Sequence, residues 1–381
     1  MELSTAFSVG RTPPCEPPAI VARVVVKPSA PAAVPTFGTT ADCPTILAAL
    51  AMMHCTRTSR RRRVRGLCMS RIRLSVGSDN LPDGNLGGLI DGKAIAADVR
   101  QEVAEQVKQL SAERGVTPGL AVVLVGDRPD SAVYVRNKTV AAKEVGISIL
   151  DYSFPATVSE AELLKCIEEL NGNSAIHGIL VQLPLPVGFD ERIVLAAIDV
   201  RKDVDGLSTL NLGSLAKPGD SPLAVPCTPA GCMELLRRSG VDVAGKECVV
   251  LGRSGIVGMP MALLLLEANA TVTMCHSRTQ DIASVCKRAD IVVAAVGKPR
   301  FVKGDWLKLG CVVLDVGINR VEDTTRKSGY RLVGDVDFES ARGKASLITP
   351  VPGGVGPMTI AMLLHNTVRL ANAASSVKQR S

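Results

Sequence analysis

The sequence lacks any apolar run approaching the roughly 20 residues that a membrane-spanning helix needs. Its longest apolar runs, at residues 46–53 and 257–266, suit a leader segment and a buried helix. Although 11 cysteines are present, none forms a C-x-x-C pair or a zinc-like spacing with histidine. We therefore expect no membrane partner and no bound metal, and the scattered cysteines after residue 77 are typical of reduced, mostly buried thiols.

Acidic residues are scarce at the start of the chain. Residues 1–77 contain eleven Lys and Arg but only three Asp and Glu, a net charge of +8. The remaining residues contain 33 basic and 34 acidic side chains, a net charge of −1, so the overall +7 belongs to this segment. The rest of the chain therefore lacks the basic surface that a nucleic-acid partner would require.

This first segment is rich in Arg, Ser, Thr, Ala and Pro, which is typical of a transit peptide. We predict import into the plastid stroma, since the first fifty residues are nearly uncharged, with the mitochondrion as second choice. The run Arg60–Arg63 alone would also fit a nuclear signal or a nucleic-acid patch.

After residue 89, helical and strand patterns alternate, which predicts an α/β fold with parallel sheets. Helices are predicted at residues 95–114, 131–145 and 159–170, and strands at 120–126, 148–154 and 176–183. A second alternation predicts helices at 229–238, 257–268 and 281–289 and strands at 247–251, 271–275, 291–296 and 311–316. We expect a first α/β domain at 89–227, a Rossmann-type domain at 228–350, and a C-terminal helix at 356–373 that returns to the first domain.

A glycine-rich turn follows the strand at 247–251. It begins Gly252-Arg253-Ser254 and continues to Pro260, directly before an apolar helix. Glycines let the backbone approach a pyrophosphate, and a helix N-terminus offers free N–H groups to it. The spacing departs from Gly-x-Gly-x-x-Gly, so a tight turn without a ligand is the alternative.

An acidic residue is missing where NAD enzymes usually place one, at the end of the next strand, to hold the ribose hydroxyls. Here that strand is followed by His276, Ser277 and Arg278. Arg253 in the turn and Ser277 or Arg278 would suit a ribose phosphate, which a carboxylate would repel. The pattern favours NADP, although Arg278 fits a solvated loop cation equally well.

Four polar residues of the first domain suggest a site for an amino-heterocycle. Tyr134 and Lys138 stand four residues apart on one predicted helix and therefore point the same way. Gln182 ends a strand, where α/β sheets bind ligands, and Asp205 follows Asp203 closely. Each has an ordinary alternative: a half-exposed helix face, a satisfied strand-end amide, or a carboxylate pair for a metal.

Six ordered segments together resemble the bifunctional methylenetetrahydrofolate dehydrogenase/cyclohydrolase family. They are residues 134–138 (YVRNK), 181–186 (VQLPLP), 202–206 (KDVDG), 226–231 (PCTPAG), 252–260 (GRSGIVGMP) and 349–359 (TPVPGGVGPMT). The resemblance covers roughly residues 89–373. It implies an N-terminal catalytic domain, an NADP-binding Rossmann domain, a folate substrate and a homodimer.

The resemblance also implies roles for individual residues. Tyr134 would stack on the folate, Asp205 would accept hydrogen bonds from the pterin, and Lys138, held by Gln182, would manage protons. Gly353, Gly354 and Pro357 would line the folate side. The cofactor would contact Gly252, Arg253, Ser254, Ser277, Arg278, Thr228, Gly297 and Ile318.

Two other function classes fit parts of the pattern. One is an NADP-dependent dehydrogenase of another small metabolite on the same two-domain layout, because fold alone does not define function. The other is a non-catalytic nucleotide-binding protein, which the presence of both Lys138 and the glycine turn disfavours.

Overall fold

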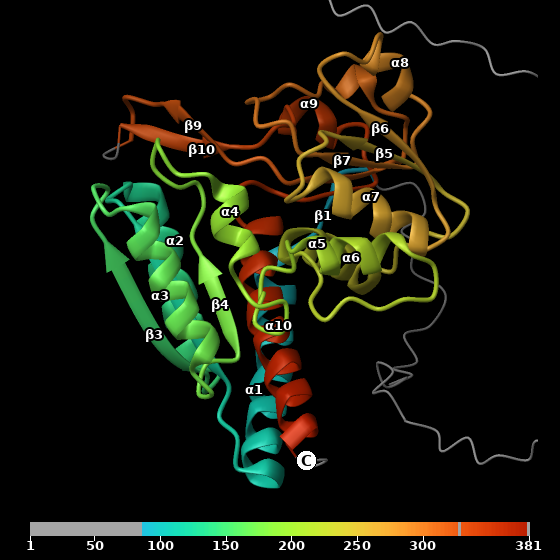
Figure 1. The fold of residues 1–381 in the computed structure, drawn as a ribbon. Coiled ribbons are helices and arrows are strands. Elements are labelled where there is room, and N and C mark those ends of the chain that lie inside the picture. Colours follow the sequence, from blue (N-terminus) through green and yellow to red (C-terminus); the bar gives the residue numbers. More distant parts are fainter. Residues whose placement is uncertain (1–85, 327–328, 379–381) are drawn as a thin grey trace, which may run out of the picture. The chain divides into compact units, whose positions relative to one another are not determined.

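Two parallel sheets organise the part of the chain that the computed structural model describes, residues 86–326 and 329–378 (Figure 1). The leader predicted at residues 1–77 lies outside this part. Within it, no helix combines the length and the apolar character needed to cross a membrane. All seven cysteines of the described part are free and buried.

The smaller sheet has three strands in the order β3–β2–β4, and both pairs are parallel. Its strands are β2 (Gly119–Val125), β3 (Ser148–Phe154) and β4 (Gly178–Val181). The same half of the chain contains the helices α1 (Gly92–Arg114), α2 (Pro129–Glu144), α3 (Glu160–Gly172), α4 (Glu191–Ala196) and α5 (Thr209–Ala216), of which α5 contacts α7 (Gly258–Glu267) of the other half. Leu120 and Val122 of β2 join one hydrophobic core, whereas Ala121 and Val123 join another on the opposite face. Burial on both faces explains the continuous apolar sequence of β2.

The larger sheet has six strands in the order β1–β11–β8–β7–β5–β6, all paired in parallel. Its strands are β1 (Gly88–Leu89), β5 (Glu247–Leu251), β6 (Thr271–Cys275), β7 (Ile291–Ala294), β8 (Val312–Asp315) and β11 (Leu347–Ile348). The helices of this half are α6 (Cys227–Arg238), α7 (Gly258–Glu267), α8 (Ile282–Cys286), α9 (Phe338–Arg342) and the 3-10 helix η1 (Gly304–Trp306). Because β5 lies between β6 and β7, the chain leaves it on one side and returns on the other. Ligands of open α/β sheets bind at the carboxyl ends of strands at such a point.

The last helix, α10 (Val355–Lys378), returns to the first half and packs along α1 and α6 (Figure 1). The predicted α/β fold with two domains and a returning helix is therefore confirmed. The helix begins one residue after Gly354, where a Cβ on Gly92 would lie only 1.9 Å from the Gly354 carbonyl oxygen. The entry into α1 and the entry into α10 thus touch backbone to backbone.

Several short elements differ from the prediction. Leu89, expected to open the first domain, lies in β1 and pairs with Ile348 of the larger sheet. An antiparallel hairpin, β9 (Asn319–Glu322) with β10 (Tyr330–Val333), was not predicted. The helix expected at 281–289 shortens to α8. Elements this short carry too few residues for a hydrophobic period to identify them.

Candidate active site

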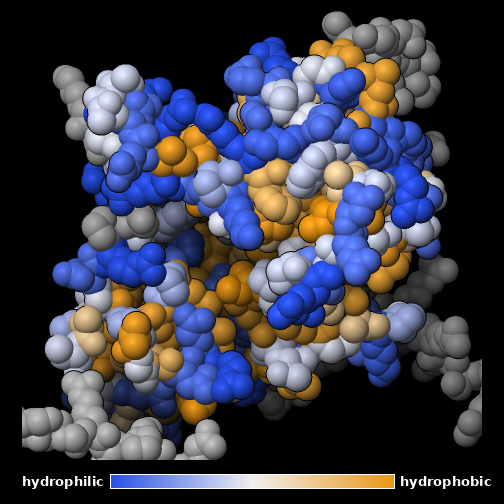
Figure 2. Space-filling view, turned by 90° about the horizontal axis from the view of Figure 1, so that it is seen from above, coloured by the Kyte–Doolittle hydropathy of each residue, from blue (hydrophilic) through white to orange (hydrophobic). Residues whose placement is uncertain are grey.

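A cavity of about 340 Å³ lies at the carboxyl end of β4, and we call it the lysine pocket. Helix α2 supplies Lys138, and the other walls come from the end of β4, the segments that follow it, the start of α6, the turn after β5 and the start of α10. It is lined by Lys138, Leu180, Val181, Gln182, Leu183, Pro184, Glu191, Asp205, Leu207, Cys227, Thr228, Ile256 and Thr359. Seen from above, the surface shows a hollow with largely hydrophobic walls and a mostly hydrophilic rim (Figure 2).

Lys138 and Gln182 form one hydrogen-bonded unit in this pocket. The lysine is only 8% exposed, and its Nζ donates to Gln182 Oε1 at 3.0 Å. Gln182 is fixed in turn, since its backbone N–H donates to Val123 O (2.9 Å) and its Nε2 to Leu183 O (2.7 Å). A buried amine needs such partners to offset the loss of water. The arrangement leaves the amine at a defined position in the cavity wall.

The two aspartates of the 202–206 segment have different tasks. Asp203 is buried and accepts hydrogen bonds from the backbone N–H groups of Leu207 and Ser208 and from Asn211 Nδ2. Asp205 instead lines the lysine pocket, where Cys227 Sγ donates to its Oδ1 at 3.8 Å. Burial raises the pKa of the Asp205 carboxyl to about 6, while the nearby Lys138 opposes the shift. Asp205 is therefore the carboxylate that a ligand can meet.

Asn366 of α10 holds together the two loops that carry Asp205 and Cys227. It is 1% exposed, and its Nδ2 donates to the carbonyl oxygens of Val204 (2.9 Å) and Val225 (2.8 Å). The returning helix thus fixes one wall of the lysine pocket. Within residues 86–326 and 329–378, no three His, Cys, Asp or Glu side chains group as metal ligands.

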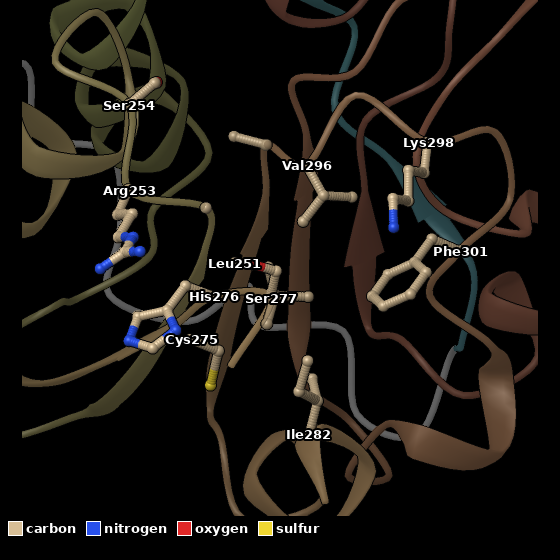
Figure 3. Close-up of a pocket in the computed structure, with 12 residues that line it drawn as sticks. Leu251, Arg253, Ser254, Cys275, His276, Ser277, Ile282, Val296, Lys298 and Phe301 are labelled. Carbon is tan, nitrogen blue, oxygen red and sulfur yellow. The ribbon is translucent and has the colours of Figure 1, made fainter. Parts of the chain in front are cut away.

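A second cavity, of about 300 Å³, lies beyond the carboxyl ends of β5, β6 and β7, and we call it the glycine-turn pocket (Figure 3). It is lined by Leu251, Gly252, Arg253, Ser254, Cys275, His276, Ser277, Ile282, Ala295, Val296, Lys298 and Phe301. Lys298 Nζ lies 5.7 Å from the centre of the Phe301 ring.

Two glycines of the turn, Gly252 and Gly258, are required by backbone packing, whereas a Cβ on Gly255 would meet nothing within 4 Å. Gly252 has a φ of +115°, and a Cβ on it would lie 2.2 Å from Ala295 O. A Cβ on Gly258, at the start of α7, would lie 2.3 Å from Gly252 O. Ser254 Oγ accepts hydrogen bonds from the N–H groups of Val257 and Gly258, which closes the turn onto the helix. At Gly252 and Gly258 the turn therefore has room for backbone atoms but not for side chains.

The structure places the predicted cofactor residues unevenly. Arg253, Ser254 and Ser277 line the glycine-turn pocket, whereas Arg278 is exposed outside it and donates its backbone N–H to His276 Nδ1. Thr228 lines the lysine pocket instead, with its Oγ1 3.0 Å from Thr359 Oγ1.

The other predicted residues lie outside both sets of lining residues. Gly297 stands between two of the glycine-turn pocket's residues, and Ile318 is exposed beside Gly356. Tyr134 lies one turn along α2 from Lys138.

Two positions of the 349–359 segment, Gly353 and Gly354, require glycine for structural reasons. Gly353 has a φ of +113°, and a Cβ on Gly354 would lie 2.7 Å from Pro350 O. Pro357 lies in the first turn of α10. Backbone packing therefore accounts for both glycines, beside the predicted role of leaving room for a substrate.

Sequence reasoning missed several residues that line the pockets. Cys227 and Thr359 belong to segments that were recognised, but neither was singled out as a site residue. His276 and Lys298 follow the carboxyl ends of β6 and β7, where α/β proteins place ligand-binding residues. Their position in the loops just beyond these strand ends was the signal that would have found them.

Comparison with known proteins identifies two matching domains. Residues 90–205 match the family model of the tetrahydrofolate dehydrogenase/cyclohydrolase catalytic domain, and residues 226–375 match that of the corresponding NAD(P)-binding domain. Among curated relatives, bifunctional protein FolD 2 of Arabidopsis thaliana is 57% identical over 280 residues, 74% of this chain and 94% of the relative. Bifunctional protein FolD 4, chloroplastic, of the same plant is 51% identical over 309 residues, 81% of this chain and 86% of the relative.

Solved structures give the same result. The Trypanosoma brucei N5,N10-methylenetetrahydrofolate dehydrogenase-cyclohydrolase (FolD), complexed with NADP cofactor and inhibitor, has a TM-score of 0.74 and 45% identity. The match covers 77% of this chain and 99% of that one. The chain belongs to the tetrahydrofolate dehydrogenase/cyclohydrolase family.

Proposed function

We propose that this protein oxidises methylenetetrahydrofolate to methenyltetrahydrofolate with NADP, and hydrolyses the product to formyltetrahydrofolate in the same pocket. The observation that carries the proposal is the buried Lys138 amine, held by Gln182 in one cavity with Asp205. The end of the glycine turn reaches this cavity through Ile256. A folate and a nicotinamide would therefore meet at its wall.

The residues of the glycine-turn pocket fit NADP. Gly252 and Gly258 let the turn fold tightly against its own backbone, and the space beside Gly255 is open, so a pyrophosphate can approach the backbone there. Arg253 and Ser277 line the same pocket and suit a ribose phosphate. When bound, the nicotinamide accepts a hydride from the folate's one-carbon bridge. The protein's part in that step is alignment of the two carbons, because the folate's ring nitrogens supply the electrons that expel the hydride.

The hydrolysis makes a different demand on the protein. The methenyl product is a cation that adds water, and a base must remove the water's proton. Lys138 Nζ is the group we assign to this proton transfer, with Gln182 fixing its position. Asp205 accepts hydrogen bonds from the amino edge of the pterin, and Tyr134 stacks on the aminobenzoyl ring.

Replacing Lys138 by methionine tests this assignment. The variant keeps much of the stem's apolar packing and deletes the amine. We expect cyclohydrolase activity to fall by about 100-fold or more, as for a lost general base, and dehydrogenase activity to fall less. Methenyltetrahydrofolate would then accumulate during turnover and is measured by its absorbance.

Lys143→Met is the matched control, because Lys143 is an exposed lysine of the same helix. Tyr134→Ala should weaken folate binding and lower both activities together. An equal loss of both activities in Lys138→Met would show that Lys138 only positions the substrate.

The raised pKa of Asp205 predicts an acidic limb in the rate profile. Above its pKa of about 6 the carboxyl is ionised and accepts hydrogen bonds, and below it the added proton removes an acceptor. We expect dehydrogenase kcat/KM for the folate to fall about tenfold for each pH unit below this value. Asp205→Asn should have low activity without that limb, and a limb that persists in this variant would contradict the assignment.

The cofactor assignment predicts a preference for NADP over NAD. Charge-assisted hydrogen bonds to the ribose phosphate should be worth about 1.5–3 kcal/mol each, or roughly 10- to 100-fold in kcat/KM. Arg253→Ala should reduce the NADP/NAD ratio of kcat/KM by that factor. Arg278→Ala should change the ratio less, because Arg278 is exposed outside the pocket. An equal preference in the unmodified protein would refute the assignment.

We further propose that residues 1–77 form a transit peptide for the plastid stroma. Their composition supports this, and the relative from Arabidopsis thaliana called FolD 4 is named as a chloroplastic protein. A fusion of residues 1–77 to a fluorescent reporter should enter plastids of leaf cells. Mitochondrial import would select the second choice, and a cytosolic or nuclear reporter would refute the proposal.

A homodimer is part of the same proposal. Within the described residues, β3 pairs only with β2, so its other edge is available to a second copy. Exposed Leu150 on β3 and Val140 on α2 add apolar surface beside that edge. Sedimentation velocity of the protein measures the oligomeric state.

A further inference from the structure

Asp335 is a fully buried carboxylate that neither the hydride step nor the hydrolysis uses. Its exposure is 0%, and each oxygen is occupied. Oδ2 accepts hydrogen bonds from the backbone N–H groups of Val296 (2.6 Å) and Gly297 (2.9 Å), and Oδ1 accepts one from Asn319 Nδ2 (2.8 Å). One side chain therefore holds the turn after β7 and the start of β9.

A second buried aspartate fixes the segment that carries Asp335. Asp315, at the carboxyl end of β8, accepts hydrogen bonds from the backbone N–H groups of Asp335 (2.8 Å), Val336 (2.9 Å) and Gly317 (3.1 Å). Burial raises the pKa of the Asp315 carboxyl to about 7, while these N–H donors oppose the shift. Burying two neighbouring carboxyl groups costs desolvation free energy, which apolar side chains in the same place would not cost. Packing alone therefore does not explain why aspartates stand at these two positions.

Two glycines make room for the carboxyls. A Cβ on Gly334 would lie 1.8 Å from Asp315 Oδ2, and a Cβ on Gly317 would lie 2.2 Å from Asp335 Cγ. Each carboxyl thus lies directly against bare backbone. Such close contact leaves the segments around Gly317 and Gly334 little freedom to shift relative to each other.

The groups held by Asp335 border the glycine-turn pocket. Val296 and Lys298 line that pocket (Figure 3). Gly297 between them has a φ of +67°, which glycine adopts without strain, and in this conformation its N–H donates to Asp335. The lysine pocket contains none of these residues. The hydrogen bonds that the Asp335 carboxylate accepts from Val296 and Gly297 therefore reach the wall of the glycine-turn pocket and not the residues that line the lysine pocket.

We propose that Asp335 is a positioning residue for the dinucleotide: by holding the Val296–Gly297 turn it sets cofactor affinity and hydride alignment, and it has no part in the addition of water. This inference rests on the proposed function, because it assigns the glycine-turn pocket to NADP and the lysine pocket to the folate.

Three measurements on Asp335→Ala and Asp335→Asn test the proposal. The first is NADP affinity, measured by quenching of tryptophan fluorescence and, independently, by calorimetry. The chain has one tryptophan, Trp306, and its ring centre lies 5.3 Å from that of Phe301 in the wall of the glycine-turn pocket. The second is dehydrogenase activity, and the third is hydrolysis of supplied methenyltetrahydrofolate without cofactor. Asp337→Asn is the matched control, since this neighbouring carboxylate makes only a surface ion pair, with Lys303.

We expect the NADP Kd of Asp335→Ala to rise by about 10- to 100-fold, as for lost hydrogen bonds to a charged group. Cofactor-free hydrolysis should stay within about twofold of the unmodified protein, as should both activities of Asp337→Asn. Parallel losses of binding and hydrolysis would make Asp335 a general structural residue and overturn the proposal, as would an unchanged Kd. An unmodified protein that neither binds NADP nor hydrolyses the folate would instead refute the proposed function.

Exchange of the two hydrogen-bonded partners keeps the test decisive if Asp335→Ala does not fold. In Asn319→Asp/Asp335→Asn, the amide oxygen at 335 can accept from the turn and its NH₂ can donate to the new carboxylate. We expect Asp335→Asn alone to weaken NADP binding and the double variant to recover the Kd to within about threefold. Equal Kd values in the single variant, the double variant and the unmodified protein would overturn the proposal.

Discussion

One hydrophobic core joins the two sheets, and the rest of the structure depends on it. It takes Leu120, Val122 and Leu180 from the smaller sheet and Val250 and Val293 from the larger one. Helices α1, α6 and α10 fill the space between them. Because interiors are packed at high density, this core fixes where the carboxyl ends of the strands lie. Both pockets stand on those ends, so their geometry is set by packing remote from the reacting groups.

Long, strongly patterned segments could be predicted from the sequence. The bounds of β3, β5 and β6 match the prediction, and β2 differs by one residue at each end. Their apolar runs are long enough to show burial on both faces. The two-residue strands β1 and β11 and the hairpin of β9 and β10 depend on pairing with distant partners, which no local pattern reveals.

The candidate site divides in the same way. Lys138, Gln182 and Asp205 could be named from spacing and from their place in recognised segments, and the structure brings them into one cavity. Asn366 and Asp335 could not, because their importance lies in hydrogen bonds to backbone groups far along the chain. A buried Asn or Asp looks like any other polar residue until the loops it holds are known. Likewise, the structural role of Asp203 could be told from the ligand-facing position of Asp205 only once the hydrogen-bond partners of both were known.

The pairing of β1 with β11 sets a limit on how the chain can be shortened from its amino end. Gly87 and Gly88 donate their N–H groups to Ala345 O and Ser346 O, and Ile90 donates to Ile348 O. A cut after this strand would strip the outer edge of the cofactor domain and leave unpaired backbone groups at β11. A shortened form of this protein that keeps residue 87 and everything after it therefore retains every hydrogen bond between β1 and β11, whereas loss of residues 87–90 removes them.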